Sequence, residues 1–390
     1  MDYLQSSREI RKTLAKYSNT QPDDWFLCLK ARFGLAVVLK CLHDNLGSGE
    51  IITTSYTCIT AINPIIVAGF KPIYADIEPS TLSINIPPKT LLNTRTKAIV
   101  MQHTLGIIGD KTALADFATE HNLLLIEDAA HCLTRMARDK NNKILADVSV
   151  HSFGVEKILT GTKFGGAIYI NPELKKKNSK LYNDITTALL ALKQPNQSTA
   201  FRVRTYRFNN ALLQRAPHNL KYRLRDASIK AKLLEPAIFP YEQEGKQAKP
   251  VTTNSYVNRI ILNQLASLKA NYNRRERNVK LYKNTLSSSK FRPITATTEP
   301  LLAYPIYFED INQANKAYDM LMSSNFFIRR WYSPLLYPGP KSNRIYHYSP
   351  QATPIAEETS KHILCLPTDL PMNATITLIN LLNSPVIASK

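Results

Sequence analysis

Cysteine is scarce in this sequence, and its pattern is that of unpaired thiols. The cysteines are five, odd in number and scattered, with no Cys-x-x-Cys pair: Cys28, Cys41, Cys58, Cys132 and Cys365. A disulfide framework uses an even, spaced set, and a structural zinc site commonly uses such pairs. The sequence therefore argues against both, and we expect a protein of the reducing cytoplasm.

Long apolar runs are missing as well. No stretch approaches the roughly 18 consecutive apolar residues that a membrane span needs. Residues 1–17 alternate charged and apolar side chains and have no hydrophobic h-region, so we expect no secretory signal. No internal repeat or low-complexity tract is evident. A chain of 390 residues with 44% hydrophobic content is typical of a globular protein with a large core and two domains.

Acidic residues are few, with 30 Asp and Glu against 50 Lys and Arg, which gives a net charge of +20. The deficit is deepest in residues 175–235, here called the basic segment, where Asp184 and Asp226 are the only acids before Glu235. Such a field attracts polyanions, namely nucleic acid, acidic lipid headgroups or phosphorylated substrates. A solvated basic face explains the same charges equally well. The sequence leaves both interpretations open.

Part of the basic segment, residues 217–236, is predicted to form an amphipathic helix. Its apolar face would hold Leu220, Leu224, Ala227, Ala231 and Leu234. A basic helix of this kind can lie on an anionic membrane. We favour packing of this face on the large domain, because the stripe contains small alanines and no Trp or Phe. We expect no nucleic-acid partner, and membrane-surface association stays open without being favoured.

Strand-like and helix-like segments alternate through the first third of the chain. Strands are predicted at 50–54, 71–75, 97–102 and 123–128, with helices at 61–68 and 111–121 between them. This rhythm favours an α/β fold with a mostly parallel sheet, in which ligands collect at the carboxyl ends of the strands. A proline- and charge-rich join at 239–250 marks a domain boundary. We therefore expect a large domain at 1–245 and a smaller α+β domain at 246–390, which begins with a long helix at 255–286.

Chemically capable side chains follow two of the predicted strands. Asp128 ends a buried strand, where an unpaired charge is expensive, so it needs a cationic partner or serves as a helix N-cap. His131 lies three residues later. Lys157 stands in a polar loop after a further strand, five residues beyond Ser152 and shortly before a Gly-Gly pair that is also compatible with a simple turn. Each residue alone is weak evidence, but a carboxylate, a lysine and a phosphate-binding hydroxyl are what a pyridine-based electron sink requires.

The combination resembles the DegT/DnrJ-type sugar aminotransferases, a branch of the fold-type-I enzymes that use pyridoxal 5'-phosphate. Ile126-Glu-Asp-Ala-Ala-His131 is similar to the family's "EDAAQ/H" segment, and Val150-His-Ser-Phe153 to its "FSF" strand. Thr53-Thr-Ser-Tyr-Thr-Cys58 resembles "PsyT", and residues 69–77 resemble "G-x-x-P-v-f-v-D-i". Near the end, residues 354–367 resemble "P-x-A-E … v-L-s-L-P". An ordered series of matches is more specific than any one motif.

The resemblance implies a role for each matched residue. Lys157 would bind the cofactor as an imine and carry the proton, and Asp128 would pair with the pyridine nitrogen. His131 would contact the cofactor's 3'-oxygen, and Ser152 would bind its phosphate. The implied enzyme takes an amino group from a donor, glutamate, and passes it to a nucleotide-linked keto-sugar, as a homodimer. Two alternatives stay open: a sugar dehydratase, although that subset has histidine in place of Lys157, and a non-catalytic binding or regulatory protein that uses its basic face.

The chain departs from the family pattern around the phosphate and the ring. Ala31-Arg32-Phe33 stands where Gly-Thr or Gly-Arg is usual, so backbone amides or Arg32 would bind the phosphate. Cys58 replaces the common ring-stacking aromatic residue, which leaves Tyr56 or another group to cover the ring. The loop after Lys157 is one residue longer than usual, and the "N-x-R-M" segment that reaches the neighbouring subunit's phosphate is not found.

Overall fold

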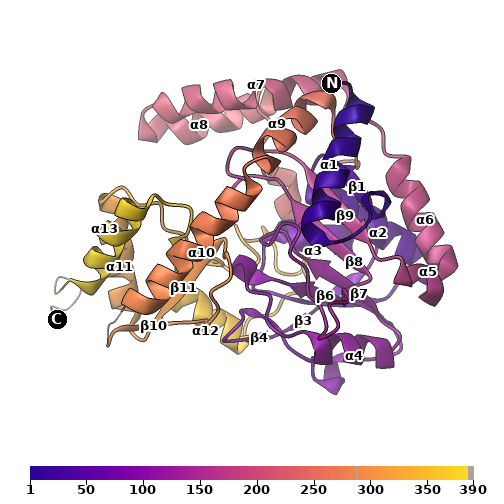
Figure 1. Ribbon diagram of the computed structural model, residues 1–390, viewed down its shortest axis with the longest axis horizontal. Coiled ribbons are helices and arrows are strands. Elements are labelled where there is room, and N and C mark those ends of the chain that lie inside the picture. The colour runs from indigo at the N-terminus through magenta and orange to yellow at the C-terminus, as the bar shows by residue number, and fades with distance from the viewer. Residues whose placement is uncertain (287–288, 385–390) are drawn as a thin grey trace.

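The computed structural model of the protein describes residues 1–286 and 289–384, and its main element is a seven-stranded sheet (Figure 1). The strands of this sheet are β1 (Trp25–Cys28), β2 (Glu50–Thr54), β3 (Lys71–Ala75), β6 (Thr96–Gln102), β7 (Leu124–Asp128), β8 (Val148–Ser152) and β9 (Gly166–Ile170). Their order across the sheet is β1-β9-β8-β7-β6-β2-β3. Strands β3, β2, β6, β7 and β8 pair in parallel, and β9 pairs antiparallel with both of its neighbours. The predicted mostly parallel sheet is confirmed.

Helices cover both faces of this sheet because its strands are apolar on both sides. Ala98, Val100 and Ile126 belong to the main core with α2 (Ala31–Leu46), whereas Ile99 and Leu125 belong to a second cluster with α4 (Thr112–Glu120). Adjacent residues alternate between the clusters, as the two-residue period of a strand requires. The remaining helices of the first half are α1 (Tyr3–Ser18), α3 (Ile59–Val67), α5 (Glu173–Lys177) and α6 (Ser179–Leu190), and a small hairpin is formed by β4 (Ile77–Glu78) and β5 (Ser83–Ile84).

A third hydrophobic cluster surrounds a three-stranded antiparallel sheet near the C-terminus. Its strands are β10 (Phe291–Pro293), β11 (Ala303–Phe308) and β12 (Ile363–Pro367), and its helices are α10 (Leu268–Thr285), α11 (Ile311–Ser323), α12 (Pro354–His362) and α13 (Met372–Asn383). The single helix predicted at 255–286 is wrong in one respect, since it is divided at Ala266–Ser267 into α9 (Ser255–Leu265) and α10. Helix α9 contacts α1, and α10 contacts α13. The domain boundary at 245/246 stays a prediction.

The basic segment ends in a helical hairpin at the edge of the molecule, where α7 (Gln197–Arg215) and α8 (His218–Lys230) lie side by side (Figure 1). Helix α8 is shorter than the predicted 217–236, and the expected packing of its apolar face on the large domain is wrong. Leu220 and Leu224 are 44% and 45% exposed, because α8 packs on α7 rather than on the sheet. Leu234, beyond the helix, is the residue of that stripe that is fully buried.

Within residues 1–286 and 289–384, no helix is long and apolar enough to cross a membrane. No group of three or more His, Cys, Asp or Glu side chains in those ranges could hold a metal ion. The polar side chains at the carboxyl ends of the parallel strands therefore form the best candidate for a functional site.

Candidate active site

Asp128 is the last residue of β7, at the carboxyl edge of the parallel strands. Its Oδ1 accepts a hydrogen bond of 3.0 Å from the backbone N–H of Ala130. The predicted helix N-cap is wrong, because a turn and no helix follows Asp128 before β8 begins. No partner for Oδ2 occurs among the described residues. Burial raises the pKa of Asp128, and the Ala130 hydrogen bond and the charge of Lys157 oppose this rise. One carboxylate oxygen is thus left for a cationic ligand.

Lys157 lies in the loop between β8 and β9 and points towards the same strand end. Its Nζ makes no hydrogen bond to any described residue and lies 5.8 Å from the ring centre of Trp331. Burial lowers the pKa of this amine, whereas nearby Asp128 and Cys58 raise it. A lysine with a lowered pKa offers its neutral, nucleophilic form at a lower pH than an exposed lysine does.

His131 is buried beside both groups and is held in one tautomer. Its Nδ1 accepts a hydrogen bond of 3.0 Å from the backbone N–H of Leu105, so the ring proton lies on Nε2. Burial, together with the charges of Lys157 and Arg329, lowers the pKa of His131 well below its usual range. Its Nε2 lies 3.3 Å from the Tyr332 hydroxyl. The ring is therefore neutral and presents an N–H donor to the site.

Glu127, the neighbour of Asp128, points to the opposite face of β7. Its carboxylate binds His103 Nε2 at 2.6 Å, the backbone N–H of Ala137 at 2.6 Å and the Ser149 hydroxyl. Burial alone would raise the pKa of Glu127, but these hydrogen bonds lower it below its usual value. Glu127 is a satisfied core carboxylate, and Asp128 is the one that a ligand can reach.

The region predicted to hold a phosphate is built from close backbone contacts. Ser152 ends β8, and its Oγ accepts a hydrogen bond from the N–H of Gly154 at 3.2 Å. The Gly-Gly pair is more than a turn, because a Cβ at Gly166 would lie 2.5 Å from the Cα of Ala31. Glycine is thus required where β9 passes the first residue of α2, next to the strand that Ser152 ends.

Arg32 and Phe33 follow in the first turn of α2, but neither is a free ligand in this structure. The Nη2 of Arg32 donates to Glu242 Oε2 at 2.9 Å and to the carbonyl of Ala237 at 2.8 Å. Phe33 is buried in the core. The predicted contact of Arg32 with a phosphate stays a prediction, and it requires the guanidinium to share or exchange its partner Glu242.

Tyr56 and Cys58 meet a segment from the other end of the chain, residues 331–337. Tyr56 is fully buried, donates its hydroxyl hydrogen to the carbonyl of Trp331 and packs edge-on against Tyr332, with ring centres 5.6 Å apart. Cys58 begins α3 and pairs with Tyr337 through a backbone bridge. The loop 55–58 is thus the docking point for the aromatic segment.

The sequence did not point to three residues at or just before this segment, namely Arg329, Trp331 and Tyr332. Trp331 stacks on His131 with ring centres 5.3 Å apart and planes at 9°, and Tyr332 continues the stack at 5.8 Å and 13°. The guanidinium carbon of Arg329 lies 5.1 Å from the Trp331 ring centre. The sequence feature that could have pointed to them is the pair of consecutive aromatic residues, Trp331 and Tyr332, in a proline-rich stretch. These flat groups stand where cover for a bound ring would be needed.

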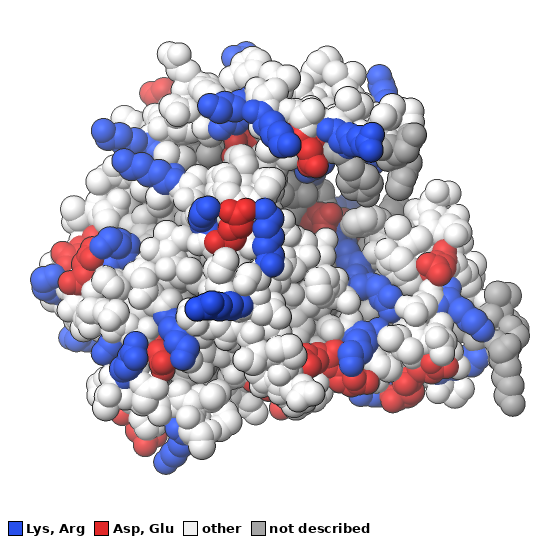
Figure 2. All heavy atoms as spheres, turned by 180° about the vertical axis from the view of Figure 1, so that it is seen from behind, with Lys and Arg blue, Asp and Glu red and all other residues white. Residues whose placement is uncertain are grey.

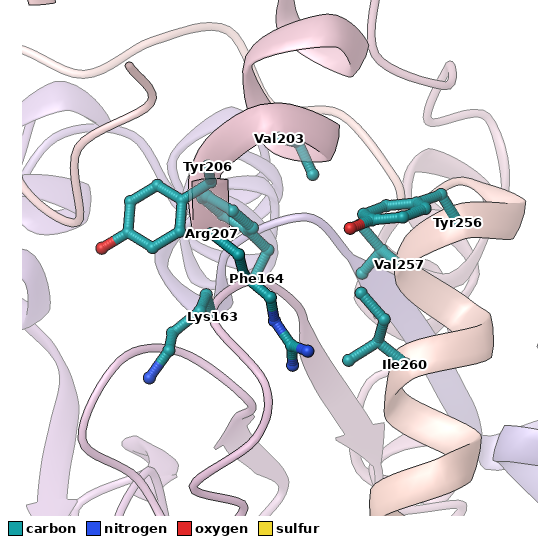
Figure 3. A pocket seen from close by; sticks show the side chains of 8 residues that line it. All are labelled: Lys163, Phe164, Val203, Tyr206, Arg207, Tyr256, Val257 and Ile260. Atoms are coloured by element: carbon teal, nitrogen blue, oxygen red, sulfur yellow. The ribbon is translucent and has the colours of Figure 1, made fainter. Parts of the chain in front are cut away.

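Helix α7 braces the loop that carries Lys157. Arg207, on α7, donates a hydrogen bond to the carbonyl of Gly161 in this loop. A small pocket lies beside it, lined from α7, from α9 and from the end of the loop (Figure 3). Its lining side chains are Lys163, Phe164, Val203, Tyr206, Arg207, Tyr256, Val257 and Ile260. Phe164, Val203, Val257 and Ile260 of this lining pack the loop against two helices, so the pocket supports the loop that carries Lys157.

Two curated relatives share sequence with this chain. The GDP-perosamine synthase of Caulobacter vibrioides is 36% identical over 140 residues, 35% of this chain and 38% of that protein. The dTDP-4-dehydro-2,3,6-trideoxy-D-glucose 4-aminotransferase of Saccharopolyspora spinosa is 32% identical over 178 residues, 45% of this chain and 46% of that protein. The chain thus matches less than half the length of either relative.

A solved structure and a family profile extend the comparison. NtdA from Bacillus subtilis, solved with bound cofactor PMP, superposes with a TM-score of 0.68 at 16% identity, over 97% of this chain and 77% of that one. This likeness shows the fold. The profile of the DegT/DnrJ/EryC1/StrS aminotransferase family matches residues 32–213, which include Asp128, His131, Ser152 and Lys157. Over that region, which is less than half of the chain, the sequence is similar to the DegT/DnrJ/EryC1/StrS aminotransferase family.

Proposed function

We propose that this protein is a pyridoxal-phosphate-dependent aminotransferase that transfers an amino group from an amino-acid donor, glutamate, to a keto group of a nucleotide-linked sugar. One observation carries the proposal: the unpartnered amine of Lys157 lies close enough to Asp128 for each to shift the pKa of the other. Asp128 keeps one carboxylate oxygen free, and His131 presents a neutral N–H beside them.

The donor set fits the cofactor. Pyridoxal phosphate offers an aldehyde for a lysine, a pyridine nitrogen for a carboxylate, a phenolic oxygen for an N–H donor and a phosphate for hydroxyl and backbone donors. Lys157, Asp128, His131 and Ser152 match these four needs in turn. The amine of Lys157 and one carboxylate oxygen of Asp128 have no hydrogen-bond partner among the described residues, whereas Nε2 of His131 has the Tyr332 hydroxyl at 3.3 Å. When bound, the cofactor would supply an electron sink for the carbon that exchanges its proton.

Each residue contributes a distinct physical effect. Asp128 stabilises positive charge at the ring nitrogen, and this effect is strong because the carboxylate is shielded from water. Lys157 is the group that can take and return a proton at the reacting carbon, since its lowered pKa favours the neutral amine. His131 fixes the ring orientation through Nε2, and the Trp331–Tyr332 stack excludes water.

The substrate classes rest on the relatives. One relative is named for a GDP-linked sugar, and the other is named a 4-aminotransferase of a dTDP-linked sugar. The net charge of +20 suits an anionic substrate such as a sugar nucleotide. Glutamate is proposed as donor from the family resemblance.

An absorbance experiment tests this function. Protein reconstituted with pyridoxal phosphate should be yellow, lose that colour on addition of glutamate and regain it with a keto-sugar nucleotide. The variant Lys157→Ala should show neither change, whereas the control Lys163→Ala, a half-buried lysine of the same loop whose amine binds the carbonyl of Thr160, should behave as the wild type. A protein that binds no cofactor, or a colour that glutamate leaves unchanged, would favour the non-catalytic alternative.

We also propose a homodimer as the active unit. The α7–α8 hairpin supports it, because Phe201, Phe208 and Leu212 are 54%, 69% and 50% exposed along one side of α7. Large apolar side chains gathered on one projecting element are typical of an interaction surface. Light scattering of the active protein measures the mass directly, and a fully active monomer would contradict this proposal.

A further inference from the structure

Arg329 is a cation placed rigidly beside the amine of Lys157, and the site described so far assigns it no task. Its backbone pairs with Cys365 on the edge of β12, through hydrogen bonds of 2.8 and 3.4 Å. Its guanidinium carbon lies 4.9 Å from the Phe327 ring centre and 5.1 Å from that of Trp331. Lys157 Nζ lies 5.8 Å from the same Trp331 ring centre. Backbone pairing and two aromatic rings thus hold the guanidinium close to the reacting amine.

Most of the hydrogen-bonding capacity of Arg329 is unused. Its Nε donates to Glu156 Oε2 at 3.1 Å. Neither Nη atom has an acceptor among the residues that the structure describes. A guanidinium carries five N–H donors in a planar fork, and the outer edge of that fork matches a carboxylate with two parallel hydrogen bonds. The side chain is only 15% exposed, so an anion that reached this edge would be largely removed from water.

Arg329 already binds one carboxylate, that of Glu156. Glu156 directly precedes Lys157, its carboxylate is 37% exposed, and its backbone has a φ of 60°, in the left-handed region that non-glycine residues rarely adopt. Within the described part of the chain, Arg329 is the single ionic partner of this carboxylate. An incoming carboxylate can therefore bind the free edge of the fork or compete with Glu156 for the guanidinium.

We propose that Arg329 binds the α-carboxylate of the amino-acid donor, with Glu156 as a resident carboxylate that competes for the same guanidinium. This inference rests on the proposed aminotransferase function and names the residue that recognises its donor. In an amino acid the α-carboxylate is bonded to the carbon that carries the reacting amine. Arg329 and the Lys157 amine both contact the Trp331 ring, and the charge of Arg329 also lowers the pKa of Lys157, so an anion next to the reacting amine lies within the field of Arg329.

The diphosphate of a sugar nucleotide is a second source of an anion, but it fits this position less well. The sugar ring separates the diphosphate from a ketone on the far side of the ring, so a diphosphate would bind several ångströms further from Lys157. The planar fork of Arg329 and the existing pair with a carboxylate both favour the donor. The two half-reactions use the two ligands separately, so they can be tested one at a time.

The test measures each half-reaction alone, by the loss and the return of the cofactor's colour, in Arg329→Gln and in the control Arg330→Gln. Arg330 has the same charge, but its guanidinium binds Asn315 and the carbonyl of Lys361 at 2.7 and 3.1 Å. For Arg329→Gln we expect the glutamate concentration at half-maximal rate to rise by about tenfold to a hundredfold, the loss of a charge-assisted pair. The half-saturating concentration of the keto-sugar nucleotide should stay within about twofold, and Arg330→Gln should change neither.

A binding measurement separates this inference from the function on which it rests. Calorimetric titration with glutarate, a dicarboxylate that cannot react, should give binding to the wild type, weaker binding to Arg329→Gln and tighter binding to Glu156→Gln. Arg329→Lys, which keeps the charge without the fork, should be intermediate and replaces the Gln variant if that variant fails to fold. An unchanged requirement for glutamate, or unchanged glutarate binding, overturns the proposal. A loss confined to the sugar nucleotide would assign Arg329 to the diphosphate instead. If the wild type transaminates nothing, the proposed function fails, and the glutarate titration still decides whether Arg329 is a carboxylate site.

Discussion

Glu127 and Asp128 are neighbours in the chain with opposite surroundings. Glu127 is saturated by His103, Ala137 and Ser149, and its pKa is lowered, whereas burial raises the pKa of Asp128. The alternation of side chains along β7 produces this difference. A pair of acidic residues at a strand end can therefore be resolved into one structural and one ligand-binding carboxylate once the hydrogen bonds are known.

This difference leads to a prediction for Asp128→Asn. The variant should bind the cofactor but lose at least two orders of magnitude in transamination rate, because a neutral amide cannot stabilise positive charge at the ring nitrogen. Single-turnover measurement of the glutamate half-reaction checks this, with Asp116→Asn on the exposed side of α4 as control. A decrease of less than about tenfold, equivalent to ~1.4 kcal/mol of barrier, would show that Asp128 has another role.

At the residue scale, the sequence could point to Asp128, His131, Ser152 and Lys157 because they lie within one ordered series of motifs. It could not point to Arg329 or Trp331. These residues meet Lys157 only because the C-terminal sheet and the loop 55–58 hold their segment in place. Such contacts depend on packing between distant parts of the chain, and no local pattern encodes them.

At the scale of elements, the basic segment is tied to the start of α2 by buried ion pairs. Lys30 Nζ lies 2.9 Å from Glu235 Oε1, and Glu235 also accepts a hydrogen bond from Arg202 Nε at 2.9 Å. Arg32 pairs with Glu242, whose side chain is 1% exposed. Burial lowers the pKa of Lys30 to about 8, although Glu235 and Glu242 oppose this effect. These pairs anchor the segment that leads into and out of the helical hairpin.

Breaking one of these pairs should therefore be costly. Glu242→Gln leaves the guanidinium of Arg32 buried without its counter-charge, and we expect the free energy of unfolding to fall by about 3–5 kcal/mol. Denaturant unfolding followed by circular dichroism provides the measurement. Glu244→Gln, which removes the 34% exposed partner of Lys246 and Lys341, is the matched control and should cost less than about 1 kcal/mol. An equal decrease in the free energy of unfolding of the two variants would show that the buried pair stabilises the fold no more than the exposed one.

Most strands of the large sheet were predicted, although β1 was not, and the helix predicted at 217–236 exists as the shorter α8. The surface that α8 packs against was not predictable. Strands at 50–54, 71–75 and 97–102 have apolar residues on both faces and are bounded by turns, so their sequence pattern indicates their structure. The stripe of α8 is amphipathic, but amphipathicity does not tell whether its apolar face meets the sheet, a second copy or water. The exposure of Leu220 and Leu224 answers that question for the single chain.

At the scale of the whole molecule, the net charge of +20 is the feature with the longest reach. Figure 2 shows lysine and arginine side chains distributed over one face, with acidic side chains mostly beside basic ones. Surface ion pairs of the described residues include Lys180 with Asp184 and Lys361 with Glu358. The excess of basic residues that remains produces a long-range field, which acts on an anionic substrate before contact.

That field should be visible in the salt dependence of catalysis. The kcat/KM for the sugar nucleotide should fall as salt is added, because the Debye length shrinks to about 8 Å at physiological ionic strength. Arg223→Glu combined with Arg225→Glu should flatten this dependence if the hairpin directs the substrate. Lys89→Glu combined with Arg95→Glu changes the net charge equally at another place and serves as control. Identical salt slopes in all three proteins would show that the basic segment does not steer the substrate.

The Trp331–His131 stack also gives the protein an internal optical reporter. The chain contains two tryptophans, and the other, Trp25, is fully buried against His151 and Tyr169 at 5.0 and 5.4 Å between ring centres. With Trp25 replaced by Phe, all indole emission would come from a ring next to the reactive amine. The fluorescence of that single tryptophan would then follow occupation of the site in real time, without a label and without turnover.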